Sequence, residues 1–331
     1  MWDGFVAASD AAEPYHPYEW RSVFERVFGH NCIYLTARNE GGDVVGILPL
    51  VQLRSRLFGN FLVSVPCFNY CGALAQDAAV LQELVAAAWR TAEELGASHV
   101  EMRHSADVKL ELPYRDDKVA MRLRLPESSD ELWKGFSSKL RAQIRRPTKA
   151  GAICEQGGLE LLDDFYAVFS RNMRDLGTPV FPKDLFRQMC ESFPEQTRLF
   201  VVRIDGQAAA AGVTYGFRDR LEIPSASSLR EYNKVSVNML LYWTVLQYAI
   251  DSGYRVFDFG RSTADAGTYR FKKQWGAEPA SLHWHYCLRP GDKLPALNPQ
   301  NARFRLATKM WQRLPLAVAN SLGPRIVRNL P

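Results

Sequence analysis

Residues Tyr254 to Pro279 read YRVFDFGRSTADAGTYRFKKQWGAEP, and this stretch decides the fold and the candidate site. The segment up to Gly260 predicts a strand, and a glycine-containing loop and a basic, aromatic segment follow it. The cations after the strand are Arg261, Arg270, Lys272 and Lys273. They are placed to hold an anion, because phosphate accepts charge-assisted hydrogen bonds from Arg and Lys. A hairpin with a solvated charged face is the alternative interpretation.

The two halves of the chain repeat one plan around this stretch. Ile33 to Val51 predicts a hairpin that turns at Gly41-Gly42, and Arg198 to Phe217 predicts another around Asp205-Gly206. Each hairpin leads into a further strand that meets a proline, then a helix, a glycine and a last strand. The sequence therefore predicts two tandem α/β modules of one type.

Both predicted helices carry an apolar face at helical spacing, and each ends at a glycine. The prolines, Pro66 and Pro224, interrupt strands just before these helices. A strand broken there leaves unpaired backbone N–H groups beside a helix amino terminus, which can receive a carbonyl oxygen or a phosphate. An ordinary edge strand is the competing explanation at each proline.

The composition is that of a soluble globular protein, with 47% hydrophobic and 23% charged residues among 331. No apolar run reaches the roughly 18 residues that a membrane span requires, and the amino terminus lacks the pattern of a secretory signal. We therefore expect a cytoplasmic protein. The six cysteines form no CxxC pair, so no metal site is predicted.

Positive charge is concentrated in two places. One is the segment from Lys139 to Lys149, which contains Arg145. It belongs to a single predicted linker helix, which begins at the capping pattern of Ser128 and Glu131 and is stopped by Pro147. The other is the tail after Asp292, which has no acidic residue. Its Trp311 and Leu314 lie among basic residues, so the tail is expected to lie on an anionic membrane surface or to pack on the second module. A solvated surface explains both clusters equally well.

Six segments resemble the FemAB family of tandem acyltransferase modules of the GNAT type. They are WRSVFERVFGH (20–30), GILPLVQLRSRLFGN (46–60), LGTPVFP (176–182), FDFGRS (257–262), GTYRFKKQWG (267–276) and RLPLAVANSLGP (313–324). The resemblance is strongest to FemAB-like proteins associated with PEP-CTERM/exosortase and exopolysaccharide systems. It implies an α/β fold, also described as α+β, with two GNAT-like modules. Each would have a mixed, mostly antiparallel sheet flanked by helices, and a basic helical tail would follow.

The same resemblance implies transfer of an acyl or aminoacyl group to an amine of an envelope polysaccharide or cell-wall precursor. The donor would be aminoacyl-tRNA or acyl-CoA, with no tightly bound cofactor. The role of a donor-channel lysine falls on Lys272, with Lys273 beside it. Acyl-CoA-dependent N-acetylation of a nucleotide sugar or small amine is one alternative. A non-catalytic accessory protein of an exopolysaccharide system is another.

No Ser-His-Asp or Cys-His arrangement is visible, so direct attack by the amine is expected rather than an acyl-enzyme. Asp258 and Glu222 are the candidate proton acceptors, although each could instead be an ion-pair partner or a solvent-facing residue. The candidate donor-binding residues are Lys272, Lys273, Arg261, Arg270, Tyr269, Asn238 and Arg145. The expected boundaries are 1–125 for the first module, 126–290 for the second with its linker helix, and 291–331 for the tail.

Overall fold

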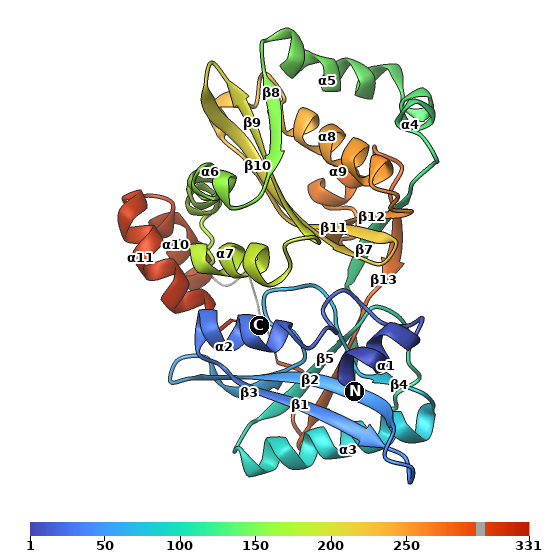
Figure 1. Ribbon diagram of the computed structural model, residues 1–331. Coiled ribbons are helices and arrows are strands. Elements are labelled where there is room, and N and C mark those ends of the chain that lie inside the picture. Colours follow the sequence, from blue (N-terminus) through green and yellow to red (C-terminus); the bar gives the residue numbers. More distant parts are fainter. Residues whose placement is uncertain (296–301, 331) are drawn as a thin grey trace.

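The computed structural model describes residues 1–295 and 302–330, and for residues 302–304 only the backbone. The chain forms two mixed sheets, one above the other in the view of Figure 1, each with helices packed against it. This confirms the expected α/β class with two modules of mixed, mostly antiparallel sheet.

The first sheet has the strand order β1-β2-β3-β5-β14-β6, with β4 paired to β2. Its strands are β1 (Asn31–Arg38), β2 (Val44–Ser55), β3 (Gly59–Val63), β4 (Leu74–Ala75), β5 (His99–His104), β6 (Tyr114–Arg115) and β14 (His283–Leu288). Three helices belong to this half of the molecule: α1 (Trp2–Ala8), α2 (Trp20–Phe28) and α3 (Ala78–Glu94). Helix α3 buries Leu84, Ala88 and Ala92 against the sheet.

The second sheet has the strand order β13-β7-β12-β11-β10-β9-β8. Its strands are β7 (Lys118–Arg124), β8 (Ile153–Gly157), β9 (Thr197–Ile204), β10 (Gln207–Phe217), β11 (Arg220–Ser228), β12 (Val256–Thr263) and β13 (Glu278–Ser281). The helices around it are α4 (Ser129–Gly135), α5 (Ser138–Lys149), α6 (Leu162–Leu176), α7 (Lys183–Ser192), α8 (Val237–Asp251) and α9 (Gly267–Lys273). Short 3₁₀ helices span Leu159–Leu161 and Arg230–Tyr232.

The repeat predicted from the sequence is present in both halves. Strands β1 and β2 form one antiparallel hairpin and β9 and β10 form the other. The last strand of each plan runs parallel to the proline-associated strand, β5 beside β3 and β12 beside β11. Gly96 and Gly253 follow the two repeated helices with φ of 62° and 82°, which a residue without Cβ adopts freely.

The two modules exchange strands. Strand β7 follows the first sheet in the chain but pairs with β12 and β13 of the second. Strand β14 follows the second sheet but pairs with β5 and β6 of the first. Strand β7 therefore lies within the range 1–125 expected for the first module but belongs to the second sheet, and β14 lies within 126–290 but belongs to the first sheet. The backbone hydrogen bonds of each sheet fix the modules to one another.

The linker differs from the single helix expected from its spacing of apolar residues. Ser128 caps α4, as predicted, but the chain turns at Phe136 and Ser137 caps a second helix, α5. Pro147 lies inside α5, which continues to Lys149, so it does not stop the helix. Its ring removes the N–H that would bond to the Gln143 carbonyl, and the helix ends soon afterwards at Lys149.

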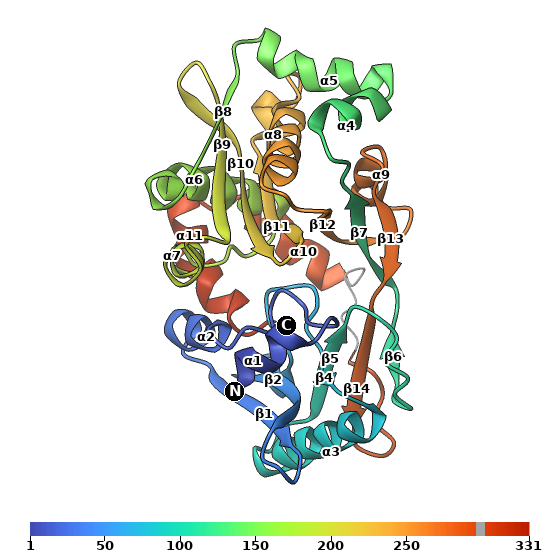
Figure 2. The same ribbon diagram turned by 45° about the vertical axis from the view of Figure 1, so that its right-hand side comes forward.

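The tail forms two helices, α10 (Ala302–Trp311) and α11 (Leu316–Val327), which lie side by side next to α6 (Figures 1 and 2). Arg174 Nη1 of α6 donates to the Leu314 carbonyl at 3.1 Å. Arg328 donates to the Phe28 carbonyl of the first module. The tail thus packs on the second module and reaches the first. Contact with a membrane stays a prediction, and the part of the tail at 296–301 and 331 lies outside the described residues.

Candidate active site

Strands β11 and β12 pair only at their starts. Their parallel register joins Arg220 to Val256, Leu221 to Phe257 and Glu222 to Asp258, and it goes no further. Beyond these residues β11 follows β10 to Ser228, while β12 follows β7 and shifts register between Asp258 and Arg261. The sheet therefore opens at the carboxyl ends of the two strands, beside Pro224, as predicted, but the proline does not interrupt β11, which continues to Ser228.

A cavity of about 180 Å³ lies on this open side. It is lined by Asn172 of α6, Ala226, Ser227 and Ser228 of β11, Asn238, Leu241 and Tyr242 of α8, and Phe271 of α9. Asn238 belongs to the first turn of α8, whose N-cap residue, Ser236, makes no side-chain cap bond. The N–H groups of this turn carry partial positive charge, which favours a carbonyl oxygen or a phosphate.

Glu222 lies at the closed end of the opening and is fully buried. Its Oε2 accepts a hydrogen bond from the Tyr15 hydroxyl at 2.8 Å, and its Oε1 accepts one from Asn69 Nδ2 at 3.0 Å. Burial, and then the neighbouring Asp258, raise the pKa of Glu222 to about 8. The carboxyl group therefore exchanges its proton near neutral pH, as a general base must. The solvent-facing alternative for this residue is wrong.

Asp258 is also fully buried, and both of its oxygens are occupied. Oδ2 accepts from the Tyr70 hydroxyl at 2.6 Å and from Arg122 Nε at 3.0 Å. Oδ1 accepts from the Gly260 N–H at 2.7 Å, which shapes the chain as it leaves the paired part of β12. Both carboxylates accept hydrogen bonds on both oxygens, but only Asp258 also forms an ion pair, with Arg122, so Asp258 is the fixed anchor and Glu222 is the better candidate to move a proton.

Lys272 of α9 is 8% exposed and turns inward. Its Nζ donates to the carbonyl oxygens of Gly260 at 3.0 Å and Arg261 at 2.8 Å. Burial lowers the pKa of Lys272 to about 8, although Asp258 and Glu222 act in the opposite direction. The structure therefore brings the predicted lysine and both predicted carboxylates to one place, the point where β11 and β12 separate.

The other candidate residues lie elsewhere. Arg270 and Lys273 are exposed on α9, and the Lys273 ammonium lies 5.8 Å from the ring centre of half-buried Tyr269. Arg145 is exposed on α5 and lies over Trp133, 5.0 Å from its ring centre. Helix α5 is at the end of the second module far from the first sheet (Figure 1). Arg145 is therefore not among the residues around the carboxylates.

The Arg261 side chain enters a different cavity, although its carbonyl binds Lys272. This cavity of about 290 Å³ is lined by Arg103, Arg115, Trp284 and Tyr286 among others. The Arg261 guanidinium lies 5.3 Å from the centre of the Trp284 ring. The residue as a whole is nevertheless exposed to solvent.

Four residues of the site were missed in the sequence. Tyr15, Asn69 and Tyr70 come from loops of the first half, and Arg122 comes from the exchanged strand β7. Their combined bonds to Glu222 and Asp258 mean that the first module closes the bottom of the second module's site. The signal in the sequence was the polar and aromatic character of the loops EPYHPYEW and VPCFNYCG, which no periodicity explains.

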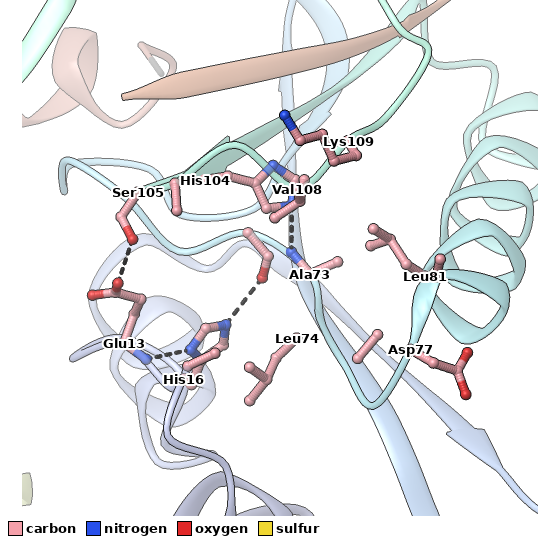
Figure 3. A pocket seen from close by; sticks show the side chains of 15 residues that line it. Glu13, His16, Ala73, Leu74, Asp77, Leu81, His104, Ser105, Val108 and Lys109 are labelled. Carbon is pink, nitrogen blue, oxygen red and sulfur yellow. Dashed lines mark hydrogen bonds between the residues drawn. The ribbon is translucent and has the colours of Figure 1, made fainter. Parts of the chain in front are cut away.

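The first module has its own opening, where β3 and β5 pair over only two residues. A cavity of about 420 Å³ beside it is lined by Glu13, His16, Asp77 and His104 among others (Figure 3). Asp77 caps α3 by accepting from the Val80 N–H at 2.9 Å, so a carboxylate occupies the helix end that is free in α8. That carboxylate disfavours an anionic ligand at this end.

The histidines of this cavity are bound into the backbone. His16 Nδ1 accepts from the Glu13 N–H, so its Nε2 donates to the Gly72 carbonyl (Figure 3). His104 Nε2 accepts from the Ala73 N–H, which leaves its Nδ1 to donate to His285 Nδ1 at 3.1 Å. Burial lowers the pKa of His104 to about 3, so its ring stays neutral. These rings hold the loop at 72–73 and are poor proton carriers.

Residues 134–273 match the sequence profile of the acetyltransferase (GNAT) domain. This range contains β11, α8, β12 and α9, and therefore Glu222, Asp258 and Lys272. No protein among the curated sequences matches the chain. Among the described residues, no cluster of His, Cys, Asp and Glu side chains could hold a metal ion.

Solved structures share the fold over nearly the whole chain. FemX matches with a TM-score of 0.67 and 13% identity, covering 87% of this chain and 96% of its own. The C-terminal domain of a putative lysylphosphatidylglycerol synthetase from Agrobacterium fabrum matches with a TM-score of 0.55 and 14% identity, covering 93% and 94%. A tandem GNAT protein from the clavulanic acid biosynthesis pathway matches with a TM-score of 0.53 and 14% identity, covering 85% and 90%. The fold is that of tandem GNAT proteins.

Proposed function

We propose that the second module is an N-acyltransferase that moves an acyl or aminoacyl group from an activated ester or thioester to an amine. One observation carries this proposal: β11 and β12 separate directly above buried Glu222 and Asp258, with the Lys272 ammonium beside them. A cavity at the amino terminus of α8 is lined by residues 226–228, which follow Glu222 along β11, and by Phe271, the neighbour of Lys272 in the chain. The GNAT profile over residues 134–273 supports the same activity.

The reaction needs a neutral amine, a group that stabilises the developing oxyanion, and an acceptor for the amine's proton. The amine nitrogen attacks the carbonyl carbon, and the bond from that carbon to the leaving oxygen or sulfur breaks. Glu222 takes the proton from the amine as the C–N bond forms. The Lys272 ammonium stabilises the negative oxygen of the tetrahedral intermediate. Asp258 holds Gly260 in place, and the leaving oxygen or sulfur departs with the proton that Glu222 took from the amine.

The donor that the cavity favours is anionic. The cavity is lined by Asn238 in the first turn of α8, and the described residues that line it include no carboxylate. Aminoacyl-tRNA and acyl-CoA both satisfy this chemistry. FemX and the lysylphosphatidylglycerol synthetase domain are the neighbours that favour an envelope component as the acceptor. We therefore place the amine on an envelope polysaccharide or cell-wall precursor, and a role in PEP-CTERM/exosortase systems stays a prediction.

The second candidate function is acyl-CoA-dependent N-acetylation of a small amine or nucleotide sugar. A tandem GNAT protein solved without AcCoA shares the fold, which favours this candidate. A purely accessory role does not require two carboxylates and a lysine to be buried together where β11 and β12 separate. In the described part of the chain, every helix falls short of the length or apolar character that a bilayer span needs.

A carboxylate introduced at the amino terminus of α8 is expected to weaken donor binding. Asn238→Asp places negative charge in the cavity at the helix end where the donor's phosphate or carbonyl would lie. We expect the dissociation constant of the Asn238→Asp variant for the donor to rise about tenfold, which corresponds to a loss of about 1.4 kcal/mol in binding free energy. Calorimetric titration with coenzyme A and with an aminoacyl-tRNA measures this constant.

Asn233→Asp is the matched control, because Asn233 is exposed in the loop before α8 and does not line the cavity. Its dissociation constant for coenzyme A should equal that of the wild type. Coenzyme A is the donor used for this comparison because its binding depends less on distant surface charge than the binding of aminoacyl-tRNA. Binding of neither coenzyme A nor aminoacyl-tRNA by the wild type would favour the accessory role. Equal binding by wild type and Asn238→Asp would place the donor elsewhere.

A further inference from the structure

Helix α10 packs on the second module through one face. Thr308 lies against the carboxyl end of α6, and the Nε1–H group of half-buried Trp311 is shielded from solvent. The opposite face carries Leu306 and Met310, which are 61% and 63% exposed, with exposed Lys309 beside them. Positions 306, 309 and 310 share one face because they are three and four residues apart on a helix. This face therefore presents two large apolar side chains and a cation to the outside.

Helix α11 repeats this arrangement. Its Ala319 and Gly323 are buried and hold it to the second module. Val318 and Leu322, four residues apart, are both 39% exposed, and Arg325 is exposed one turn further along. Both helices of the tail thus leave apolar side chains uncovered next to cations.

The turn between β2 and β3 adds a third exposed apolar segment beside the tail. Leu57 is 81% exposed, and Phe58, Arg54 and Arg56 are exposed around it. Phe58 and Leu330 line the same cavity, so the turn adjoins the end of the tail. In Figure 1 the turn and the two tail helices lie on the same side of the molecule. Two segments that are far apart in the sequence therefore bring apolar and basic side chains to one side.

The charge of the tail is positive. The sequence after Asp292 contains no acidic residue. Its exposed cations include Arg305, Lys309, Arg313 and Arg325, and none of these four forms an ion pair with a described residue. Basic side chains that flank apolar ones can bind the phosphates of lipid headgroups while the apolar groups enter the boundary of the acyl chains. The pattern therefore fits the surface of an anionic bilayer.

Two other occupants match this surface less well. A second copy of the chain would bring the same cations against the tail, which is unfavourable because like charges repel. A nucleic acid would match the cations, but single strands are also held by rings that stack on the bases. The exposed large apolar side chains of the described tail are Leu306, Met310, Val318 and Leu322, and none of them has a ring. A bilayer is the occupant that uses both the cations and these apolar groups.

We propose that α10, α11 and the turn at 54–58 hold the protein on the surface of a bilayer that contains anionic phospholipids. Leu306, Met310 and Leu57 enter the boundary between the headgroups and the acyl chains, and Lys309 and Arg313 bind lipid phosphates. Such attachment needs no membrane-spanning helix. It does not rest on the proposed acyltransferase activity, because none of these residues lines the opening between β11 and β12.

Cosedimentation of the protein with vesicles tests the proposal. We expect binding to vesicles of phosphatidylcholine and phosphatidylglycerol in equal parts to be at least about tenfold tighter than binding to phosphatidylcholine alone, and to weaken as salt is added. Lys309→Gln/Arg313→Gln should lower the affinity for the mixed vesicles at least about tenfold, because each cation contributes about fivefold. Arg145→Gln/Lys149→Gln is the matched control, which removes the same charge at the same spacing from exposed positions on α5, and it should bind like the wild type.

A second pair of variants tests the apolar contact. Leu306→Gln/Met310→Gln keeps every charge and removes the two apolar side chains. It should lower the affinity for the mixed vesicles at least about tenfold, since binding at the interface scales with the apolar area that is buried. Ile153→Gln/Leu159→Gln, the same change at two exposed apolar residues before α6, should bind like the wild type. Circular dichroism shows that all four variants are folded.

Three results would overturn the proposal: equal affinity of the wild type for the two kinds of vesicle, tail variants that bind like their controls, or loss of binding in only one of the two tail variants. Sedimentation of the lipid-free protein tests the second copy, because a dimer that Leu306→Gln/Met310→Gln dissociates would assign the surface to self-association. Titration with a single-stranded RNA tests the nucleic acid. RNA binding that Lys309→Gln/Arg313→Gln abolishes, without vesicle binding by the wild type, would assign the surface to RNA.

Discussion

A Lys272→Met variant is expected to lose roughly 10²–10³-fold in kcat, the range seen when one donor to an oxyanion is removed. Methionine keeps much of the side-chain volume but has no ammonium to face the developing negative oxygen. Because Lys272 Nζ is directed inward to the carbonyls of Gly260 and Arg261, donor affinity should change only a few-fold. Rates measured by mass spectrometry of the transferred product, with donor titration in parallel, separate kcat from binding.

Lys273→Met is the matched control for this variant. It is the same substitution at the next residue of α9, but Lys273 is exposed, and its ammonium lies 5.8 Å from the centre of the Tyr269 ring. We expect near wild-type kcat, with at most a modest change in the donor's KM. The two unpaired carbonyls in Lys272→Met cost about 1–3 kcal/mol of stability each, so rates are compared below its melting temperature. Equal kcat for the two variants would remove Lys272 from the mechanism.

A Glu222→Gln variant is expected to lose about 10²–10⁴-fold in rate, the contribution of a positioned general base. Glutamine is isosteric and can still bond to Tyr15 and Asn69, but it cannot take a proton. The pKa values of Glu222 and Lys272 are both about 8, and the base must be deprotonated while the ammonium stays protonated. The wild-type rate should therefore rise and then fall with pH around a maximum near 8, and the rising limb should vanish in the variant.

The same carboxyl group makes folding stability depend on pH. Its folded-state pKa of about 8 lies above its ordinary value of 4.5, so between these values the folded protein holds a proton that the unfolded chain has lost. This contribution to stability is complete below pH 4.5 and falls as the pH rises towards 8. Urea unfolding at pH 5, 7 and 9 should show Glu222→Gln gaining stability relative to the wild type as the pH rises.

Glu278→Gln serves as the control for both readouts, because Glu278 is exposed on β13. It should follow the wild type at each pH. If Glu222→Gln keeps the rising limb of the rate, the base is another group. If its stability relative to the wild type does not change between pH 5 and pH 9, Glu222 is already ionised in the folded protein.

Local signals in the sequence predicted most of the elements. The hairpin turns at Gly41-Gly42 and Asp205-Gly206 and the helix ends at Gly96 and Gly253 depend on a few adjacent residues, and all are confirmed. The sequence could identify Glu222, Asp258 and Lys272 because all three lie on strands and a helix of the same module. The break at Ser137 was missed because the apolar spacing continued through a second cap.

Residues brought together by the exchange of strands could not be predicted in this way. Arg122 reaches Asp258 only because β7 joins the second sheet, and Tyr15 and Tyr70 reach the site because the modules are fixed together. The positive charge of the basic residues also did not indicate where their side chains point. Arg261, Lys272 and Lys273 are close in sequence, but their side chains lie in a cavity, in the interior and on the surface.

Hydrogen–deuterium exchange with and without the bound donor tests most directly whether the opening between β11 and β12 is the transfer site. We expect slower exchange on addition of donor in peptides covering 224–242 and 260–273, which contain most of the cavity lining and Lys272. Peptides covering 72–81, beside the first module's opening, should be unchanged. Protection confined to residues 72–81, with none in the second module, would contradict the account.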